Sequence, residues 1–231
     1  MKYRKLNLLL LAVLFSLNYS CDKNIDKKEN DQDIIVEKID KSNKNRIVGD
    51  KHFIDGYSAL SEDSLIHVII EIPTGTVEKW EVEKKTGELA LETRNGDLRK
   101  VNYLGYPGNY GMIPQTLSPL EDGGDGDPLD VLILGEPLER GSIVSAKLIG
   151  VLNLLDRNEQ DDKLIAVVEG SPFYEINDIE ELGLKFKGVT NIIEIWFNSY
   201  KGGDKIEIIG YGNEKEAKQI LNAAIQGYLN K

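Results

Sequence analysis

The stretch 121–134, EDGGDGDPLDVLIL, constrains the fold of this chain more than any other part of the sequence. It joins three aspartates, Asp125, Asp127 and Asp130, to an apolar run that is typical of a buried strand. A glycine and a proline between the aspartates favour a bent entry, which gathers the carboxylates at the mouth of the strand. Carboxylates this close repel one another, and a hard divalent cation relieves the repulsion. A solvated acidic turn is the alternative, and the spacing does not fit a calcium EF-hand loop.

The N-terminus has the pattern of an export signal. Residues 1–20 combine a basic start with a mostly apolar run, which predicts a signal peptide, although a single-pass anchor is the rival interpretation. The apolar run is short for a bilayer span. It ends in LNYSC, which resembles a bacterial lipobox except for Asn18, and Cys21 is the only cysteine. We therefore expect lipidation of Cys21 and an exported, membrane-anchored bacterial lipoprotein on the periplasmic face or cell surface. A secreted protein with a free thiol is the alternative.

The residues after Cys21 are polar and charged. Residues 21–50 are dominated by Asp, Lys, Asn and Glu, so we expect a lipidated cysteine followed by a flexible tether, and a folded domain over residues 51–231. The net charge of −11 gives the chain no reason to bind nucleic acid. It would also repel an anionic substrate unless metal ions inverted the local field.

The rest of the sequence predicts an α+β fold. Short strands without a βαβ rhythm, followed by late helices, indicate a closed barrel. In the helix expected over residues 191–200, Ile192, Ile195 and Trp196 recur at helical spacing. The other expected elements are strands over residues 64–73, 79–83, 141–155 and 205–212 and a helix over residues 213–230.

Several polar residues interrupt these elements. Glu71 lies inside an apolar strand, which costs free energy unless the carboxyl is paired or faces a polar cavity. Lys79 and Glu81 share one face of the next strand, where they could form only a surface ion pair. Tyr106 and Tyr110 lie on a turn whose glycines and proline forbid a helix, so they are interpreted as donors that face a ligand.

Two further groups have simple structural alternatives. Asp156, Asp161 and Lys163 lie in and after a polar turn between two strands, which is often a solvated hairpin. Tyr200 and Lys201 end a helix before two glycines and could serve only as capping residues.

These motifs together resemble the family I (soluble) inorganic pyrophosphatases. GDGDPLDVL is similar to the family signature, and the Glu of IEIP, the Lys-aromatic-Glu strand, the YxxNYG turn, the spaced aspartates with their lysine and the Tyr-Lys pair also match, from about Ser64 to the C-terminus. The resemblance implies an OB-like five-stranded β-barrel flanked by helices, in a homo-oligomer. It also implies Mg²⁺-dependent hydrolysis of pyrophosphate to two phosphates by a metal-activated water, without a covalent enzyme intermediate.

The resemblance also implies residue roles. Asp127 would be the general base, with Tyr110 and Arg99 as further catalytic residues, and Glu71 and Glu81 would complete the polar site. Several Mg²⁺ ions would be held by Asp125, Asp130, Asp156 and Asp161. Substrate phosphate would be bound by Lys79, Arg99, Tyr106, Tyr110, Lys163, Tyr200 and Lys201.

Some alternatives stay open. Arg94 is the rival of Arg99, and Arg157 stands where many family members carry an acid, which affects a peripheral metal ion. The chain could be a lipoprotein that binds a cation or phosphate without catalysis. It could also be another metal-dependent phosphohydrolase that acts on nucleotides or phosphate esters.

Overall fold

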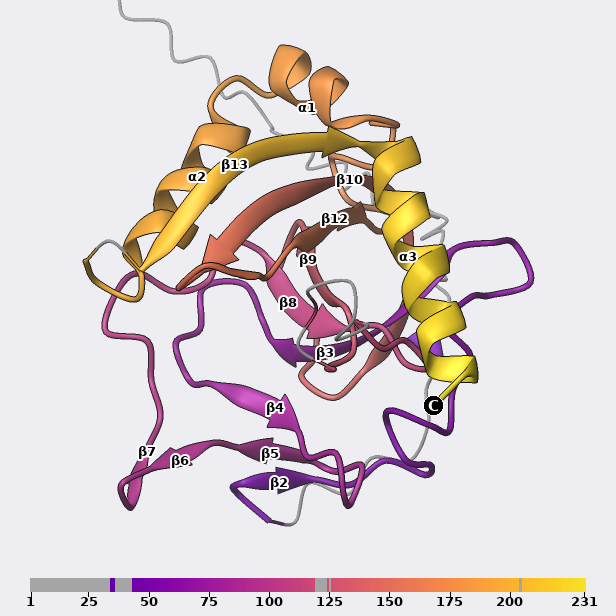
Figure 1. The fold of residues 1–231 in the computed structure, drawn as a ribbon, viewed down its shortest axis with the longest axis vertical. Helices are drawn as coiled ribbons and strands as arrows, with labels where there is room; N and C mark the ends of the chain where they lie inside the picture. The colour runs from indigo at the N-terminus through magenta and orange to yellow at the C-terminus, as the bar shows by residue number, and fades with distance from the viewer. Residues whose placement is uncertain (1–33, 36–42, 119–123, 125, 204) are drawn as a thin grey trace, which may run out of the picture. The chain divides into compact units, whose positions relative to one another are not determined.

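The longest of the described strands, β10 (Ile143–Asp156), crosses the upper half of the ribbon in Figure 1. The computed structural model describes residues 34–35, 43–118, 124, 126–203 and 205–231. The predicted signal peptide, Cys21 and Asp125 lie outside them. Asp31–Lys231 form one compact unit.

Five strands close into a barrel. Going round it, β3 pairs with β8, β8 with β9, β9 with β12, β12 with β10, and β10 again with β3. Only the β9–β12 pair is parallel among these five pairs. The predicted five-stranded OB-like barrel is therefore confirmed. Besides β10, its strands are β3 (Ile66–Ile72), β8 (Asn109–Met112), β9 (Asp130–Leu134) and β12 (Lys163–Val167).

Strand β10 has 14 residues, so it reaches beyond the barrel, and its pairing is irregular. Its register shifts between Leu148 and Gly150 against β12, and β-bulges of this kind bend a strand and increase its twist. It also pairs with three outer strands, which are β1 (Ile34–Ile35), β11 (Glu159–Gln160) and β13 (Ile206–Asn213).

A small sheet lies below the barrel in Figure 1. Its order is β2 (Arg46–Ile47), β5 (Leu89–Leu91) and β4 (Trp80–Val82), and the hairpin of β6 (Thr93–Arg94) and β7 (Asp97–Leu98) follows it. The folded part therefore begins before the predicted domain boundary at residue 51, and the flexible tether predicted over residues 21–50 is wrong at β2. The reason is packing, since Ile47 is only 5% exposed.

In the described part of the chain, three helices flank the barrel, as expected, and α3 runs along its side in Figure 1. They are α1 (Ile179–Lys185), α2 (Val189–Ser199) and α3 (Glu214–Leu229). Helix α3 begins where the Asn213 side chain accepts a hydrogen bond from the Glu216 N–H at 3.0 Å. None of the described helices has the length and apolar character needed to cross a bilayer.

The buried face of α2 differs from the spacing noted in the sequence. Ile193, Trp196 and Phe197 are buried, whereas Ile192 and Ile195 are each 60% exposed. Trp196 belongs both to the predicted apolar face and to the face that is buried. The sequence alone therefore did not determine how the helix is rotated against the barrel.

Candidate active site

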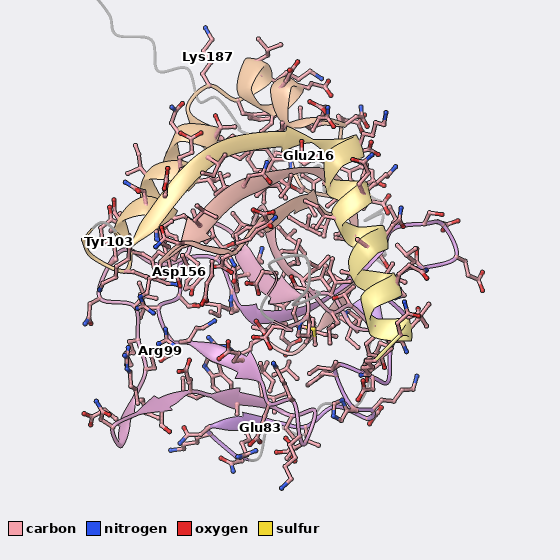
Figure 2. All side chains as sticks on the ribbon, in the orientation of Figure 1. Glu83, Arg99, Tyr103, Asp156, Lys187 and Glu216 are labelled. Carbon is pink, nitrogen blue, oxygen red and sulfur yellow. The ribbon has the colours of Figure 1, made fainter. Side chains whose placement is uncertain are left out.

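One cavity of about 660 Å³ lies between the barrel and the small sheet, and it collects the predicted site residues. Figure 2 shows Asp156 on the barrel side of this space and Arg99 on the side of the small sheet. Every predicted site residue that the structure describes lines the cavity. They are Glu71, Lys79, Glu81, Arg99, Tyr106, Tyr110, Asp127, Asp130, Asp156, Asp161, Lys163, Tyr200 and Lys201.

The acidic loop is anchored where it enters β9. The Ser118 N–H donates to the Asp127 carbonyl at 2.8 Å, and the Gly126 N–H donates to the Ser118 carbonyl at 2.9 Å. The Thr116 hydroxyl accepts from the Leu129 N–H at 2.9 Å. These bonds fix the backbone around Asp127, whose carboxylate forms an ion pair with Lys84 on the β4–β5 turn. The predicted general base is thus held at the cavity by the loop and by the small sheet.

A buried ion triad occupies the barrel wall of the cavity. The Lys163 ammonium, only 3% exposed, lies 2.6 Å from Asp130 Oδ2 and 2.5 Å from Asp161 Oδ1. Burial would raise the pKa of Asp130, but Lys163 and Lys79 outweigh it and hold that pKa below its usual value. Burial raises the pKa of Asp161. The attraction of Lys163 opposes this rise, and repulsion from Asp130 adds to it, so the pKa stays above its usual value. Two carboxylates thus share one internal cation.

The hairpin between β10 and β12 presents these acids. It turns at Arg157 and Asn158, whose φ angles of 53° and 71° suit a tight two-residue hairpin turn. Asp162 turns away from the cavity and accepts a hydrogen bond from the Leu154 N–H at 3.1 Å. Asp156 at the end of β10 instead meets the Lys201 ammonium at 2.7 Å. The alternative of a merely solvated hairpin is wrong, because Asp156 and Asp161 are only 21% and 23% exposed.

Aromatic rings form another wall. Trp196 of α2 stacks on Tyr200 with ring centroids 4.5 Å apart and lies 4.4 Å from Tyr106, which in turn lies 5.3 Å from Tyr110. Burial raises the pKa of Tyr106, Tyr110 and Tyr200, so their hydroxyls remain protonated donors at neutral pH. Tyr110 contributes to the lowered pKa of Asp130. The tyrosine hydroxyls are therefore protonated and can donate hydrogen bonds in the cavity.

Glu71 of barrel strand β3 faces the small sheet, whose side of the cavity carries the predicted Lys79 and Glu81. Lys79 lies 3.5 Å from Glu81, and nearby acidic groups raise its pKa although burial opposes them. Glu71 is buried, and its carboxyl accepts a hydrogen bond from the Val82 N–H at 3.0 Å. Burial raises the pKa of Glu71 to about 8, against the opposing effect of Lys79. Glu71 is therefore largely protonated at neutral pH in the metal-free protein.

This pKa gives the free energy of unfolding a pH dependence. Between an unfolded value of 4.5 and a folded value of about 8, the folded state binds one proton more than the unfolded state. Stability from this group therefore falls as pH rises through that window, by up to about 1.4 kcal/mol per pH unit. We expect Glu71→Gln to match the wild type near pH 4.5 and to be more stable by about 2–4 kcal/mol near pH 8.5. Urea denaturation without Mg²⁺ measures the difference, and parallel pH profiles for the two proteins would contradict it.

Five charged residues that line the cavity were missed by sequence reasoning, and they are Arg46, Glu83, Lys84, Glu92 and Glu159. Arg46 belongs to the segment predicted to be a tether, where it pairs with Glu83 at 2.9 Å and Glu88 at 2.7 Å. Lys84 and Glu92 carry no motif, and they meet Asp127 and Arg99 respectively. Each partner is distant in sequence or lies across a turn, so no spacing rule could have indicated these contacts.

The carboxylates fit a cation. Within the described residues, no three Asp, Glu, His or Cys side chains come close enough to hold a metal ion by themselves. Asp156 Oδ1, however, is buried without a hydrogen-bond partner, and Asp130 and Asp161 depend on one ammonium group. Mg²⁺ prefers carboxylate oxygens and keeps several waters, so few protein ligands suffice. Asp125, the remaining predicted ligand, lies outside the described residues.

Comparisons with known proteins agree with this geometry. The sequence model of the inorganic pyrophosphatase family matches residues 68–229. The inorganic pyrophosphatase of Xylella fastidiosa strain 9a5c is 38% identical over 168 residues, which cover 71% of this chain and 89% of that protein. The solved inorganic pyrophosphatase of Helicobacter pylori matches with a TM-score of 0.62 at 32% identity, over 71% of this chain and 94% of that chain. A type I inorganic pyrophosphatase from P. falciparum gives a TM-score of 0.71 at 26% identity, over 83% of this chain and 67% of that chain.

Proposed function

This chain belongs to the family I inorganic pyrophosphatases, and from that premise we propose how its own residues hydrolyse pyrophosphate. The family establishes a metal-dependent hydrolase of inorganic pyrophosphate. The residue roles and the choice of Mg²⁺ are our proposal. The observation that carries it is the convergence of Asp127, Asp130 and Lys163 on one cavity.

The aspartates of the cavity would hold Mg²⁺. They are Asp125, Asp130, Asp156 and Asp161. Bound Mg²⁺ would neutralise phosphoryl oxygens and lower the pKa of a coordinated water. Lys163 and Lys201 pair with Asp130, Asp161 and Asp156 and line the same cavity, so their ammonium groups would lie beside a bound phosphate.

Asp127 would accept the proton of the attacking water. Its carboxylate is half-exposed at the cavity and its backbone is fixed by the bonds to Ser118, so it can contact a water without a change of fold. The water oxygen attacks one phosphorus, and the bond from that phosphorus to the bridging oxygen breaks. Lys79, Arg99 and the tyrosine hydroxyls would stabilise the charge on the departing phosphate.

The direct test is phosphate release from pyrophosphate by the full chain. We expect rapid release with Mg²⁺, a fall to the assay background with excess EDTA, and recovery when Mg²⁺ is restored. Pyrophosphate should be hydrolysed much faster than tripolyphosphate, ATP or a phosphomonoester. Faster hydrolysis of ATP would favour the nucleotide phosphohydrolase, and a folded, Mg²⁺-binding protein without activity would favour the binding lipoprotein.

The N-terminal sequence supports an exported lipoprotein. The basic start, the apolar run and LNYSC are the grounds for cleavage before Cys21 and acylation of its thiol. The diacyl anchor would attach the enzyme to a membrane, because two chains give stable binding where one does not. Mass spectrometry of the N-terminal peptide from native membranes is the decisive measurement, and an unmodified Met1 or a free Cys21 thiol contradicts the proposal.

Exposed apolar side chains support a homo-oligomer. Ile192 and Ile195 are each 60% exposed on α2. A second copy of the same surface would cover them by a two-fold contact, which is the commonest arrangement in soluble oligomers. Light scattering during gel filtration tests this proposal, and a monomer at micromolar concentration contradicts it.

A further inference from the structure

Glu92, to which no role is assigned above, holds the guanidinium of Arg99 in the cavity. Arg99 Nη1 donates to Glu92 Oε1 at 2.7 Å and to Oε2 at 2.5 Å. The two side chains are 28% and 35% exposed, for Glu92 and Arg99 respectively, and both line the cavity. The residue expected to bind phosphate is therefore already bonded to a carboxylate of its own chain.

The backbone builds this contact into the fold. The Arg99 N–H donates to the Glu92 carbonyl at 2.8 Å, the Glu92 N–H to the Lys79 carbonyl at 2.9 Å, and the Lys79 N–H to the Arg99 carbonyl at 3.0 Å. These three bonds form a closed ring around the base of the β6–β7 hairpin. The hairpin turns at Asn95 and Gly96, whose φ angles of 55° and 89° suit a tight turn. Glu92 is thus fixed beside Arg99 and Lys79.

A carboxylate and a phosphoryl group need the same donors. The planar guanidinium can bind a phosphoryl group through parallel N–H groups, and Glu92 already accepts from Nη1, so the two compete for Arg99 at that nitrogen. We propose that Glu92 is a positioning residue that competes with phosphoryl groups for Arg99 and thereby weakens the binding of substrate and of product phosphate by the same factor. This inference rests on the role proposed for Arg99.

The competition has a use in the reaction cycle. Each turnover leaves two phosphate ions in a cavity that is rich in cationic groups, and tight binding of them would slow product release. The Glu92 carboxylate can return to Arg99 as a phosphate leaves, so that the guanidinium is never left unpaired. The same contact makes the substrate bind less tightly than the donors alone would allow.

Glu92→Gln tests the proposal, because glutamine keeps the size of the side chain and loses its charge. We expect the Kd for inorganic phosphate, measured by calorimetry with Mg²⁺, to fall about three- to tenfold. The KM for pyrophosphate should fall by a similar factor, and kcat should stay the same or fall because release of the more tightly bound phosphate slows. Phosphate binding that is unchanged or weaker in this variant overturns the proposal.

A matched control distinguishes the loss of the Glu92–Arg99 contact from the loss of one negative charge at the cavity. Glu83→Gln removes the same charge beyond the opposite end of β4, where Glu83 pairs with Arg46 instead of Arg99. Figure 2 shows the positions of Glu83 and Arg99. We expect Glu83→Gln to leave the phosphate Kd within about twofold of the wild type. An equal gain in both variants overturns the proposal, because it would assign the effect to net charge alone.

A double-mutant cycle with Arg99→Met tests the phosphate role of Arg99 separately from the competition by Glu92. The gain from Glu92→Gln should disappear when Arg99 is absent, since the residues then have no contact to lose. If Arg99→Met alone leaves phosphate affinity unchanged, the phosphate role of Arg99 is wrong. If Arg99→Met weakens phosphate binding but Glu92→Gln has no effect, the role of Arg99 stands and only the competition is wrong.

Discussion

Replacing Asp127 with asparagine is expected to lower kcat for pyrophosphate hydrolysis by about 10²- to 10⁴-fold, the range that a positioned general base contributes. Asparagine has the same shape but cannot take a proton from the attacking water. The backbone bonds to Ser118 do not involve the Asp127 side chain, so the loop should keep its conformation. Steady-state kinetics with saturating Mg²⁺ measure the loss, and the melting temperature should change little because the side chain is 46% exposed.

Asp162→Asn is the matched control for Asp127→Asn. Asp162 lies next to the predicted ligand Asp161, but its carboxyl accepts a hydrogen bond from the Leu154 N–H, which an amide oxygen can also accept. This variant should keep kcat within a few-fold of the wild type. Activity in Asp127→Asn equal to that of Asp162→Asn would remove Asp127 from the role of base, or would identify a contaminating enzyme as the source of the activity.

Replacing Lys163 with methionine is expected to cause the largest loss of stability of any single change at the site, about 3–5 kcal/mol in the free energy of unfolding without Mg²⁺. The substitution leaves the carboxylates of Asp130 and Asp161 facing each other without the ammonium that now lies within 2.6 Å of both. Mg²⁺ should stabilise the variant more than the wild type, because a cation held by the same carboxylates replaces the lost charge.

Urea denaturation with and without Mg²⁺ tests the prediction for Lys163. Lys84→Met is the control, since it removes an ammonium that also pairs with an aspartate of the site but is 62% exposed. It should cost less than about 1 kcal/mol, as exposed ion pairs do. Equal losses in the two lysine variants, or equal stabilisation of Lys163→Met and the wild type by Mg²⁺, would show that the triad does not depend on Lys163.

Much of the barrel could be predicted because its strands carry local signals. Glu71 interrupts an apolar run, and Asp156, Asp161 and Lys163 surround a tight turn, so each could be placed on its element from a few residues of sequence. All of them then line one cavity, as the resemblance implied. The strand pairing that brings them together, above all the contact of β10 with β3, has no local signal.

The side-chain contacts that hold the site residues could not be predicted from the sequence. Nothing near Arg99 or Asp127 indicates that Glu92 and Lys84 would hold them, because each contact depends on how the small sheet faces the cavity. The strand at Arg46 was missed for a similar reason, since composition predicts disorder while pairing with β5 provides order. For Ile192, helical periodicity gave the element correctly but not its rotation.

The closure of the barrel has a consequence for a growing chain. When synthesis has reached residue 134, β3, β8 and β9 exist, yet the barrel still lacks β10 and β12. The closing pair joins Ile69 to Ile143, and contacts between such distant residues form slowly because the entropy of the intervening loop must first be lost. Tyr200 and Lys201 come later still. A chain still on the ribosome therefore lacks the activity until β10 and β12 close the barrel and the later site residues join the cavity.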